Sequence, residues 1–87
     1  MRIQFKQKNR VIVIDAIQML RFNNDNVGLI LPYSKRLENK NYDTYESTTP
    51  ADEADFNRWC EQLLRTGYLD LTRTDLEFKA TYSTPIK

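Results

Sequence analysis

The sequence has few of the residues on which most enzyme active sites depend. Its 87 residues include no histidine, one cysteine, two glycines and three prolines. Without histidine there is no Ser-His or Cys-His nucleophile, and no side chain with an ordinary pKa near neutrality can act as a general base. The isolated glycines, Gly28 and Gly67, cannot form a glycine-rich phosphate-binding loop. We therefore expect a protein that is not an enzyme and has no catalytic residues.

The single cysteine excludes an internal disulfide and, without histidine, the usual zinc sites. Cys60 follows Trp59 in an apolar stretch, which favours a buried structural thiol. We interpret Asp52, Glu53 and Asp55 as acids that stabilise a helix start, because side chains so close together on a helix diverge too far to share a magnesium ion. We expect no metal and no cofactor.

Long apolar runs are also missing. Residues 1–6 alternate between apolar and polar side chains instead of forming the apolar segment of a signal peptide. No window approaches the roughly 20 apolar residues of a membrane span. Together with the lone cysteine, which agrees with a reducing compartment, these absences predict a cytoplasmic protein that does not bind membranes.

The composition that is present is that of a small folded domain. A chain of 87 residues has room for one hydrophobic core. Hydrophobic residues make up 40% and charged residues 29%, while the aromatic content of 11% is too high for a disordered chain. We expect one domain over residues 1–87, with residues 83–87 fraying beyond Pro85.

The formal net charge of +1 is the sum of a basic N-terminal half and an acidic C-terminal half. Residues 1–40 carry a net charge of +5 and residues 41–87 a net charge of −4. The acidic half includes a stretch from Asp43 to Asp55 with no lysine or arginine. This asymmetry either steers charged partners or makes the two halves attract each other across the fold.

Residues 2–7 and 10–17 are predicted to form two strands joined at Lys8 and Asn9. The first segment alternates, and the second contains the β-branched run Val11 to Ile14. A two-residue turn predicts the following pairs: Gln7 with Arg10, Lys6 with Val11, Phe5 with Ile12, Gln4 with Val13, Ile3 with Ile14 and Arg2 with Asp15. A looser turn is the alternative, because Lys8 tolerates positive φ poorly.

A second hairpin is predicted around the Asn/Asp cluster at residues 23–26, since these side chains favour turns. Its strands are residues 18–22 and 27–31, and Pro32 ends the second one. A helix over residues 12–22 is the rival, but it has a β-branched start and no capping residue. Residues 33–48 have no clear period, and residues 42–47 are predicted as a short edge strand.

One helix is predicted from about Pro50 to Thr66. Thr49 is a suitable N-cap, Pro50 suits the first helical position, and Gly67 suits the left-handed residue after the end. The helix should pack through an apolar face that consists of Phe56, Trp59, Cys60, Leu63 and Leu64. We expect Phe56 and Trp59 to dominate that contact.

After Gly67 the sequence alternates again, with an apolar face that consists of Leu69, Leu71, Leu76, Phe78, Ala80 and Tyr82. Residues 72–75 are predicted as a turn between two segments. The element order predicts an α+β domain: an antiparallel sheet of about four or five strands, with one amphipathic helix packed across one face.

The best candidate binding residues lie in the segment without a clear period, where charges of both signs stand among tyrosines. They are Lys35, Arg36, Lys40, Tyr42, Asp43, Tyr45 and Glu46. Tyrosines are common anchors at protein interfaces, and charges accelerate encounter. We expect a non-enzymatic protein-binding module, of the kind that phages and mobile elements encode to inhibit a larger bacterial protein or nucleoprotein machine.

The alternative is a small nucleic-acid-binding domain. Its phosphate-binding patch would be formed by the basic residues of the first hairpin, Arg2, Lys6, Lys8 and Arg10, together with residues 35–40. A net charge of only +1 counts against this alternative. A homodimer through an edge strand is a further expectation, because unpaired strand edges favour such contacts.

Overall fold

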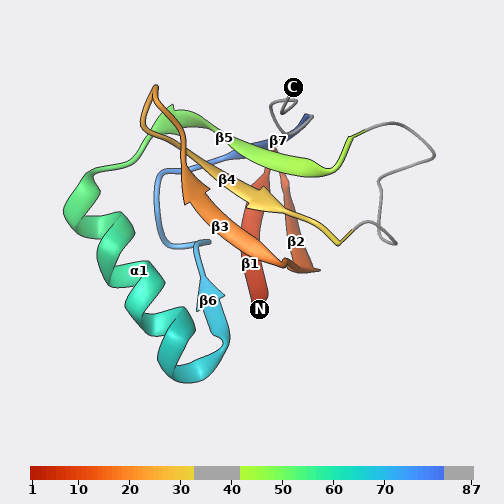
Figure 1. The fold of residues 1–87 in the computed structure, drawn as a ribbon. Coiled ribbons are helices and arrows are strands. Elements are labelled where there is room, and N and C mark those ends of the chain that lie inside the picture. The colour runs from red at the N-terminus through yellow and green to blue at the C-terminus, as the bar shows by residue number, and fades with distance from the viewer. Residues whose placement is uncertain (33–41, 82–87) are drawn as a thin grey trace, which may run out of the picture.

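The computed structural model describes residues 1–32 and 42–81, and it is drawn in Figure 1. Within these ranges the chain forms seven strands and one helix, which confirms the predicted α+β class. The elements are β1 (Arg2–Gln7), β2 (Arg10–Asp15), β3 (Gln18–Arg21), β4 (Asn26–Ile30), β5 (Thr44–Pro50), α1 (Glu53–Thr66), β6 (Tyr68–Asp70) and β7 (Phe78–Thr81). The predicted tail at residues 83–87 lies outside the described residues.

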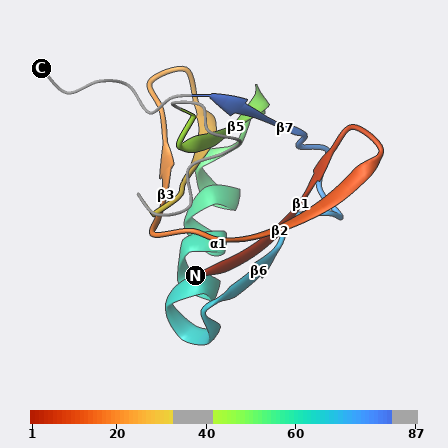
Figure 2. The same ribbon diagram turned by 90° about the vertical axis from the view of Figure 1, so that its right-hand side faces the viewer.

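The described strands form two sheets, whereas the sequence indicated only one. A four-stranded antiparallel sheet has the order β3-β4-β5-β7, and a three-stranded sheet has the order β2-β1-β6. Figure 2 shows the second sheet apart from β3, β5 and β7. In the three-stranded sheet β6 runs parallel to β1 and pairs Leu69 with Ile3. Local patterns do not reveal this pairing, because its partners are far apart in sequence.

The first hairpin confirms the predicted register at every pair from Gln7 and Arg10 to Arg2 and Asp15. The turn has two residues, and Lys8 adopts the left-handed conformation with φ 56°. The fit of apolar side chains on one face of the hairpin therefore outweighs the strain at Lys8. The second hairpin, β3 with β4, is also confirmed, and Asp25 in its turn has φ 70°.

Phe5 on β1 joins the two sheets at the centre of the core. Its side chain is fully buried, and its ring centroid lies 4.8 Å from those of both Tyr45 on β5 and Phe78 on β7. Tilted ring pairs of this kind add to the free energy gained from burial alone. Ile3 from one sheet and Leu29 from the other are also fully buried, so one core lies between the sheets.

β5 is an interior strand, and not the edge strand that was predicted at residues 42–47. It lies between β4 and β7, with Tyr45 opposite Leu29 on one side and Ala80 on the other. The prediction was wrong on this point because β7 comes from a segment more than thirty residues further along the chain. The rest of the segment without a clear period, residues 33–41, lies outside the described residues.

Helix α1 begins three residues later than predicted. Thr49 and Pro50 still belong to β5, and Asp52 is the N-cap, although its side chain makes no capping hydrogen bond. The Ala51 N–H donates to the Asp25 carbonyl at 2.9 Å, and this contact holds the chain in the sheet for longer than the capping pattern indicates. The helix end is as predicted: Gly67 has φ 73° and donates its N–H to the Leu63 carbonyl.

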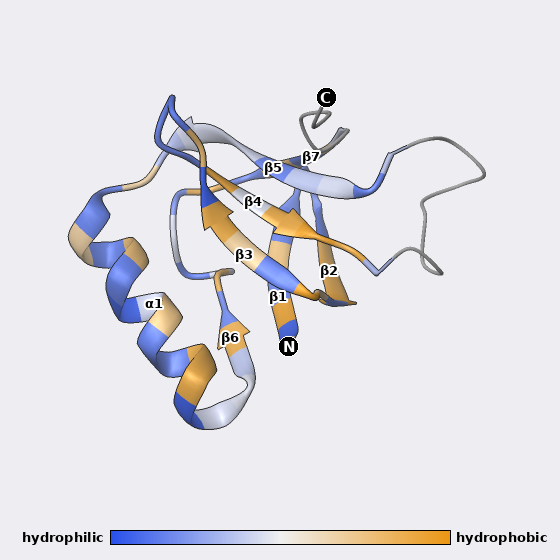
Figure 3. Ribbon diagram, in the orientation of Figure 1, coloured by the Kyte–Doolittle hydropathy of each residue, from blue (hydrophilic) through white to orange (hydrophobic). Residues whose placement is uncertain are grey.

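The apolar face of α1 also differs from the prediction. Leu63 is buried and Phe56, Trp59 and Cys60 are partly buried against the core, but Leu64 is 88% exposed. Phe56 and Trp59 were expected to dominate the contact of the helix, but both are only partly buried and Leu63 is the buried residue of α1, which packs alongside the short strand β6. In Figure 3 the orange of hydrophobic residues appears in patches on α1 and along β2.

The C-terminal strands follow the predicted alternation. Leu69 in β6 and Phe78 in β7 are buried, as are Leu71 and Leu76 between the two strands, and Ala80 in β7 is partly buried. The segment between them turns as predicted, with the Thr74 N–H and hydroxyl both donating to the Leu71 carbonyl. The two strands belong to different sheets, so this turn carries the chain from one sheet to the other. Tyr82 lies outside the described residues.

Candidate functional site

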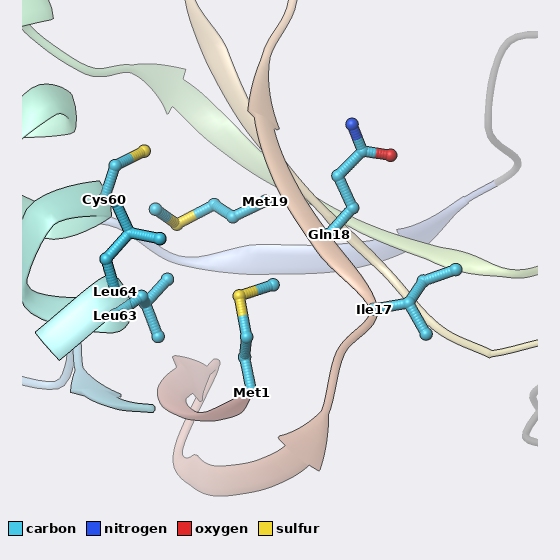
Figure 4. A pocket seen from close by; sticks show the side chains of 7 residues that line it. All are labelled: Met1, Ile17, Gln18, Met19, Cys60, Leu63 and Leu64. Carbon is cyan, nitrogen blue, oxygen red and sulfur yellow. The ribbon is translucent and has the colours of Figure 1, made fainter. Parts of the chain in front are cut away.

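A hollow lies between the C-terminal half of α1 and the corner where the chain passes from β2 into β3. It has a volume of ≈ 430 Å³, and its lining side chains are drawn in Figure 4. They are Met1, Ile17, Gln18, Met19, Cys60, Leu63 and Leu64. None of these side chains carries a formal charge, so the hollow favours apolar groups.

Backbone hydrogen bonds hold this corner in place. Met1 and Ala16 exchange two bonds, at 2.7 and 3.0 Å, and the Ile17 N–H donates to the Ile30 carbonyl in the other sheet. The alternation of β2 continues through Ala16, which is buried, to Ile17, which falls on the exposed side. The side chain of Ile17 is therefore 61% exposed.

The hollow has a buried floor and an exposed rim. Met19 and Leu63 are buried at its base, whereas Ile17 and Leu64 on the rim are largely exposed and Met1 is 39% exposed. In Figure 4 the side chains of Met1 and Met19 extend into the space beside α1, and Ile17 points away from the helix. Methionine side chains adapt to irregular apolar surfaces, so the base can adjust to different occupants.

Cys60 is the thiol that lines this hollow. It is half-buried, and burial raises the pKa of its thiol above the ordinary value. The thiol is therefore protonated at neutral pH, and the thiolate that a nucleophilic mechanism requires is disfavoured. Cys60 therefore contributes a protonated thiol to the lining of the hollow.

A second, more polar cleft of ≈ 360 Å³ lies beside the start of α1. Its lining includes Asp52, Asp55, Arg58, Trp59 and Arg73. Arg58 and Asp55 pair at 2.7 Å and so satisfy each other. Within residues 1–32 and 42–81 no group of three or more potential metal ligands is close enough to hold an ion. Local pairing accounts for Arg58 and Asp55, and the helix start accounts for Asp52.

The described members of the predicted partner-binding set lie at and before the start of β5. Tyr42 and Asp43 are half-buried, and the Asp43 carboxylate accepts a hydrogen bond from the Thr44 hydroxyl at 2.9 Å. Tyr45 is only 8% exposed, and its ring packs on Phe5. Glu46, on the opposite face of the strand, accepts from the Asn26 amide at 3.1 Å.

These residues therefore do not form one continuous surface, because Tyr45 and Glu46 point to opposite faces of the sheet. Tyr45 contributes to the core. The remaining members of the set, Lys35, Arg36 and Lys40, lie outside the described residues.

The predicted nucleic-acid patch is divided as well. Arg2 and Lys6 lie on the outer face of the three-stranded sheet, Lys8 is in the turn, and Arg10 shares the inner face with its partner Gln7. The outer face also carries two carboxylates, of which Asp15 lies 3.8 Å from Arg2.

The second carboxylate of that face is Asp70, which stands opposite Gln4. Hydrogen bonds from the side chain and backbone of Thr72 lower the pKa of Asp70 below its ordinary value, so it remains ionised. The two carboxylates balance the charges of Arg2 and Lys6 on this face, so the four side chains together give no net positive charge to attract phosphate groups.

Sequence reasoning missed the hollow. The available signals were Leu64, which directly follows Leu63 on a helix that can bury only one of them, and Ile17, which follows the alternating run of β2. Neither signal shows that the two side chains approach the same space.

No family model, curated protein or solved structure matches this chain. Among the described residues no helix is both long and apolar enough to cross a membrane.

Proposed function

We propose that this protein is a non-enzymatic protein-binding module and that the apolar hollow is its docking surface. The observation that carries the proposal is the exposure of large apolar side chains at the hollow, above all Leu64 at 88% and Ile17 at 61%. Apolar side chains that stay in water around a concave surface are typical of protein interaction sites.

The chemistry of the hollow defines what it binds. Its lining side chains carry no charge, and they favour a leucine, methionine or phenylalanine side chain that projects from the surface of a partner protein. Full burial of one such side chain contributes about 1.5–3 kcal/mol before the costs of association. An 87-residue domain without a catalytic apparatus acts on a larger protein by occupying its surface, which is how an inhibitor acts.

Protein is favoured over nucleic acid because the basic residues are divided between faces. Arg2 is already paired with Asp15, and Lys6 shares its face with the same carboxylate. A phosphate-binding surface needs several cations that converge without acids among them.

The test compares proteins captured from bacterial lysate at moderate salt by the wild-type chain and by three variants. Leu64→Lys and Ile17→Lys place a charge on the rim of the hollow, whereas Val11→Lys places the same charge on an exposed position outside it. We expect a stoichiometric partner that the wild type and Val11→Lys retain and both rim variants lose. Circular dichroism verifies that each variant is folded.

Cys60 gives a second measurement at the same site. It is the single cysteine of the sequence and lines the hollow, so bound partner should slow its alkylation by a small maleimide. The proposal is wrong if no partner is captured, or if rim variants keep the partner and Cys60 is not protected. Loss of the complex after nuclease treatment would favour the nucleic-acid alternative instead.

A further inference from the structure

In the part of the chain that the structure describes, no other strand covers the outer edge of β2. β2 is the first strand in the order β2-β1-β6, and no element of residues 1–32 and 42–81 pairs with its other side. Four consecutive apolar residues, Val11 to Ile14, occupy its centre, and its register with β1 has no bulge. Proteins usually protect such edges with lysine, proline or a bulge inside the strand.

The hydrogen-bond pattern shows which backbone groups face this open edge. Met1 and Ala16 exchange two backbone bonds. In an antiparallel pair such bonded positions alternate, so Ile14, Ile12 and Arg10 also bond to β1. The N–H and C=O groups of Val11, Val13 and Asp15 consequently point away from β1.

The side chains at these outward-pointing positions lie on the outer face of the sheet. Val11 is 57% exposed and Val13 is 54% exposed, while Ile12 and Ile14 on the inner face are only partly buried. One strand therefore presents unpaired backbone groups and apolar side chains on both of its faces.

We propose that β2 pairs antiparallel with β2 of a second copy of this chain, around a two-fold axis at Val13. A two-fold axis perpendicular to the sheet brings the outer faces of both copies to the same side, so only residues on the same face can be opposed. Val13 then faces Val13, Ile12 faces Ile14, and Val11 faces Asp15 of the other copy. The three bonded positions exchange about six backbone hydrogen bonds, and the two sheets become one.

In this register charged side chains of one copy lie beside opposite charges of the other copy. Asp15 stands beside Val11 of the second copy, whose own neighbour across the sheet is Lys6. The carboxylate is therefore placed between its own Arg2, 3.8 Å away, and Lys6 of the second copy. Arg10 faces Ala16, so no like charges are opposed. This complementarity identifies a second copy, rather than a foreign strand, as the occupant of the edge.

Light scattering during size-exclusion chromatography tests the pairing with a matched pair of variants. The wild-type chain should have about twice the monomer mass of 10.4 kDa. Val13→Lys puts two ammonium groups opposite each other at the axis and should reduce the mass to that of the monomer. Val11→Lys makes the same change at similar exposure but faces Asp15, so the dimer should persist.

Cross-linking determines the register. In a Cys60→Ser background, Val13→Cys should form a disulfide-linked dimer under mild oxidation, because opposed residues at a bonded position have Cα atoms about 5.5 Å apart. Val11→Cys should not, because Asp15 stands opposite.

A monomeric wild type at all concentrations, equal loss of the dimer in Val11→Lys and Val13→Lys, or equal cross-linking at residues 11 and 13 would overturn the proposal. None of these residues lines the hollow, so failure of the dimer leaves the proposed docking surface intact.

Discussion

The two sheets share one core but present different outer faces. On the four-stranded sheet the opposed residues Glu46 and Lys79 make the outer face polar, and Phe22 covers Gly28 so closely that a Cβ there would lie 2.5 Å from its ring. On the three-stranded sheet Val11 and Val13 stand in solvent. One outer face is therefore complete within the monomer, and the other has apolar surface available for a partner.

The exposed apolar residues follow the same division. The described large hydrophobic side chains that remain exposed are Met1, Val11, Val13, Ile17, Leu64 and Tyr68. They belong to the three-stranded sheet, to the corner that leaves it and to the end of α1, and none belongs to β4, β5 or β7. The shared core and the exposed apolar residues lie on different faces, so substitutions should separate stability from the binding that we propose.

The largest expected effect tests whether the two sheets share one core. Phe5→Ala removes a fully buried ring that contacts Tyr45 and Phe78, and we expect it to destabilise the domain by about 3–5 kcal/mol. That is most of the stability of a small domain. Urea unfolding followed by Trp59 fluorescence and by circular dichroism measures the loss.

The matched control, measured at a concentration at which the protein is monomeric, is Val13→Ala, which removes a valine exposed in the monomer and should change stability by no more than about 0.5 kcal/mol. Two separate unfolding transitions, or equal effects of the two substitutions, would show that the sheets do not share one core.

An intermediate effect is expected within the four-stranded sheet. The fully buried Ser47 hydroxyl accepts from the Val27 N–H at 2.8 Å and donates to the Thr49 carbonyl at 2.7 Å. The hydroxyl thus gives a hydrogen-bond partner to the Val27 N–H and to the Thr49 carbonyl, close to the point where the register of β4 and β5 shifts. Ser47→Ala leaves both groups without this partner and should cost about 1–3 kcal/mol in urea unfolding.

Thr49→Ala is the control for Ser47→Ala. It removes only the exposed side chain of Thr49 and keeps the backbone carbonyl that accepts from Ser47. A Ser47→Ala protein as stable as the Thr49→Ala protein would mean that the sheet does not depend on this hydroxyl. Neither substitution should alter binding at the hollow.

The smallest effect concerns Cys60 in the hollow. Burial raises the thiol pKa in the folded state, so as pH rises the unfolded chain loses this proton first. The free energy of unfolding should decline once pH exceeds the ordinary thiol pKa, and the decline should end above the folded-state pKa. Urea unfolding between about pH 7 and 10 measures the slope.

Cys60→Ala supplies the reference, because tyrosines and lysines titrate in the same range in both proteins. The wild type should lose more stability with rising pH than this variant does. Parallel curves for the two proteins would show that the thiol is as accessible to water in the folded as in the unfolded chain.

Features that depend on neighbours in the sequence were predictable. The register of β1 and β2 follows from alternation around a short turn, and Gly67 ends α1 because only its left-handed conformation lets the N–H reach Leu63. The second hairpin follows from the turn preference of the Asn/Asp cluster. In each case the interacting groups are close along the chain, so local preferences and the final contacts agree.

The candidate site was less predictable than the fold. Tyr45 was expected at a binding surface because tyrosines are common at interfaces, but the same amphipathic ring also suits a core, where Phe5 packs against it. The sequence marks Leu63 and Leu64 as equally apolar. Only the position of α1 beside β6 determines that Leu63 is buried and Leu64 lies on the rim of the hollow.

The sequence by itself determined the α+β class, the two hairpins, the end of the helix and the absence of histidine chemistry. Tertiary structure decided that the strands divide into two sheets, that β5 is interior, that α1 starts at Glu53 and that an apolar hollow forms at the corner. The physical reason is the separation along the sequence between the residues that interact. The parallel pairing of Arg2 with Tyr68 and the presence of Ile17 and Leu64 on the rim of one hollow depend on how distant faces compete for burial.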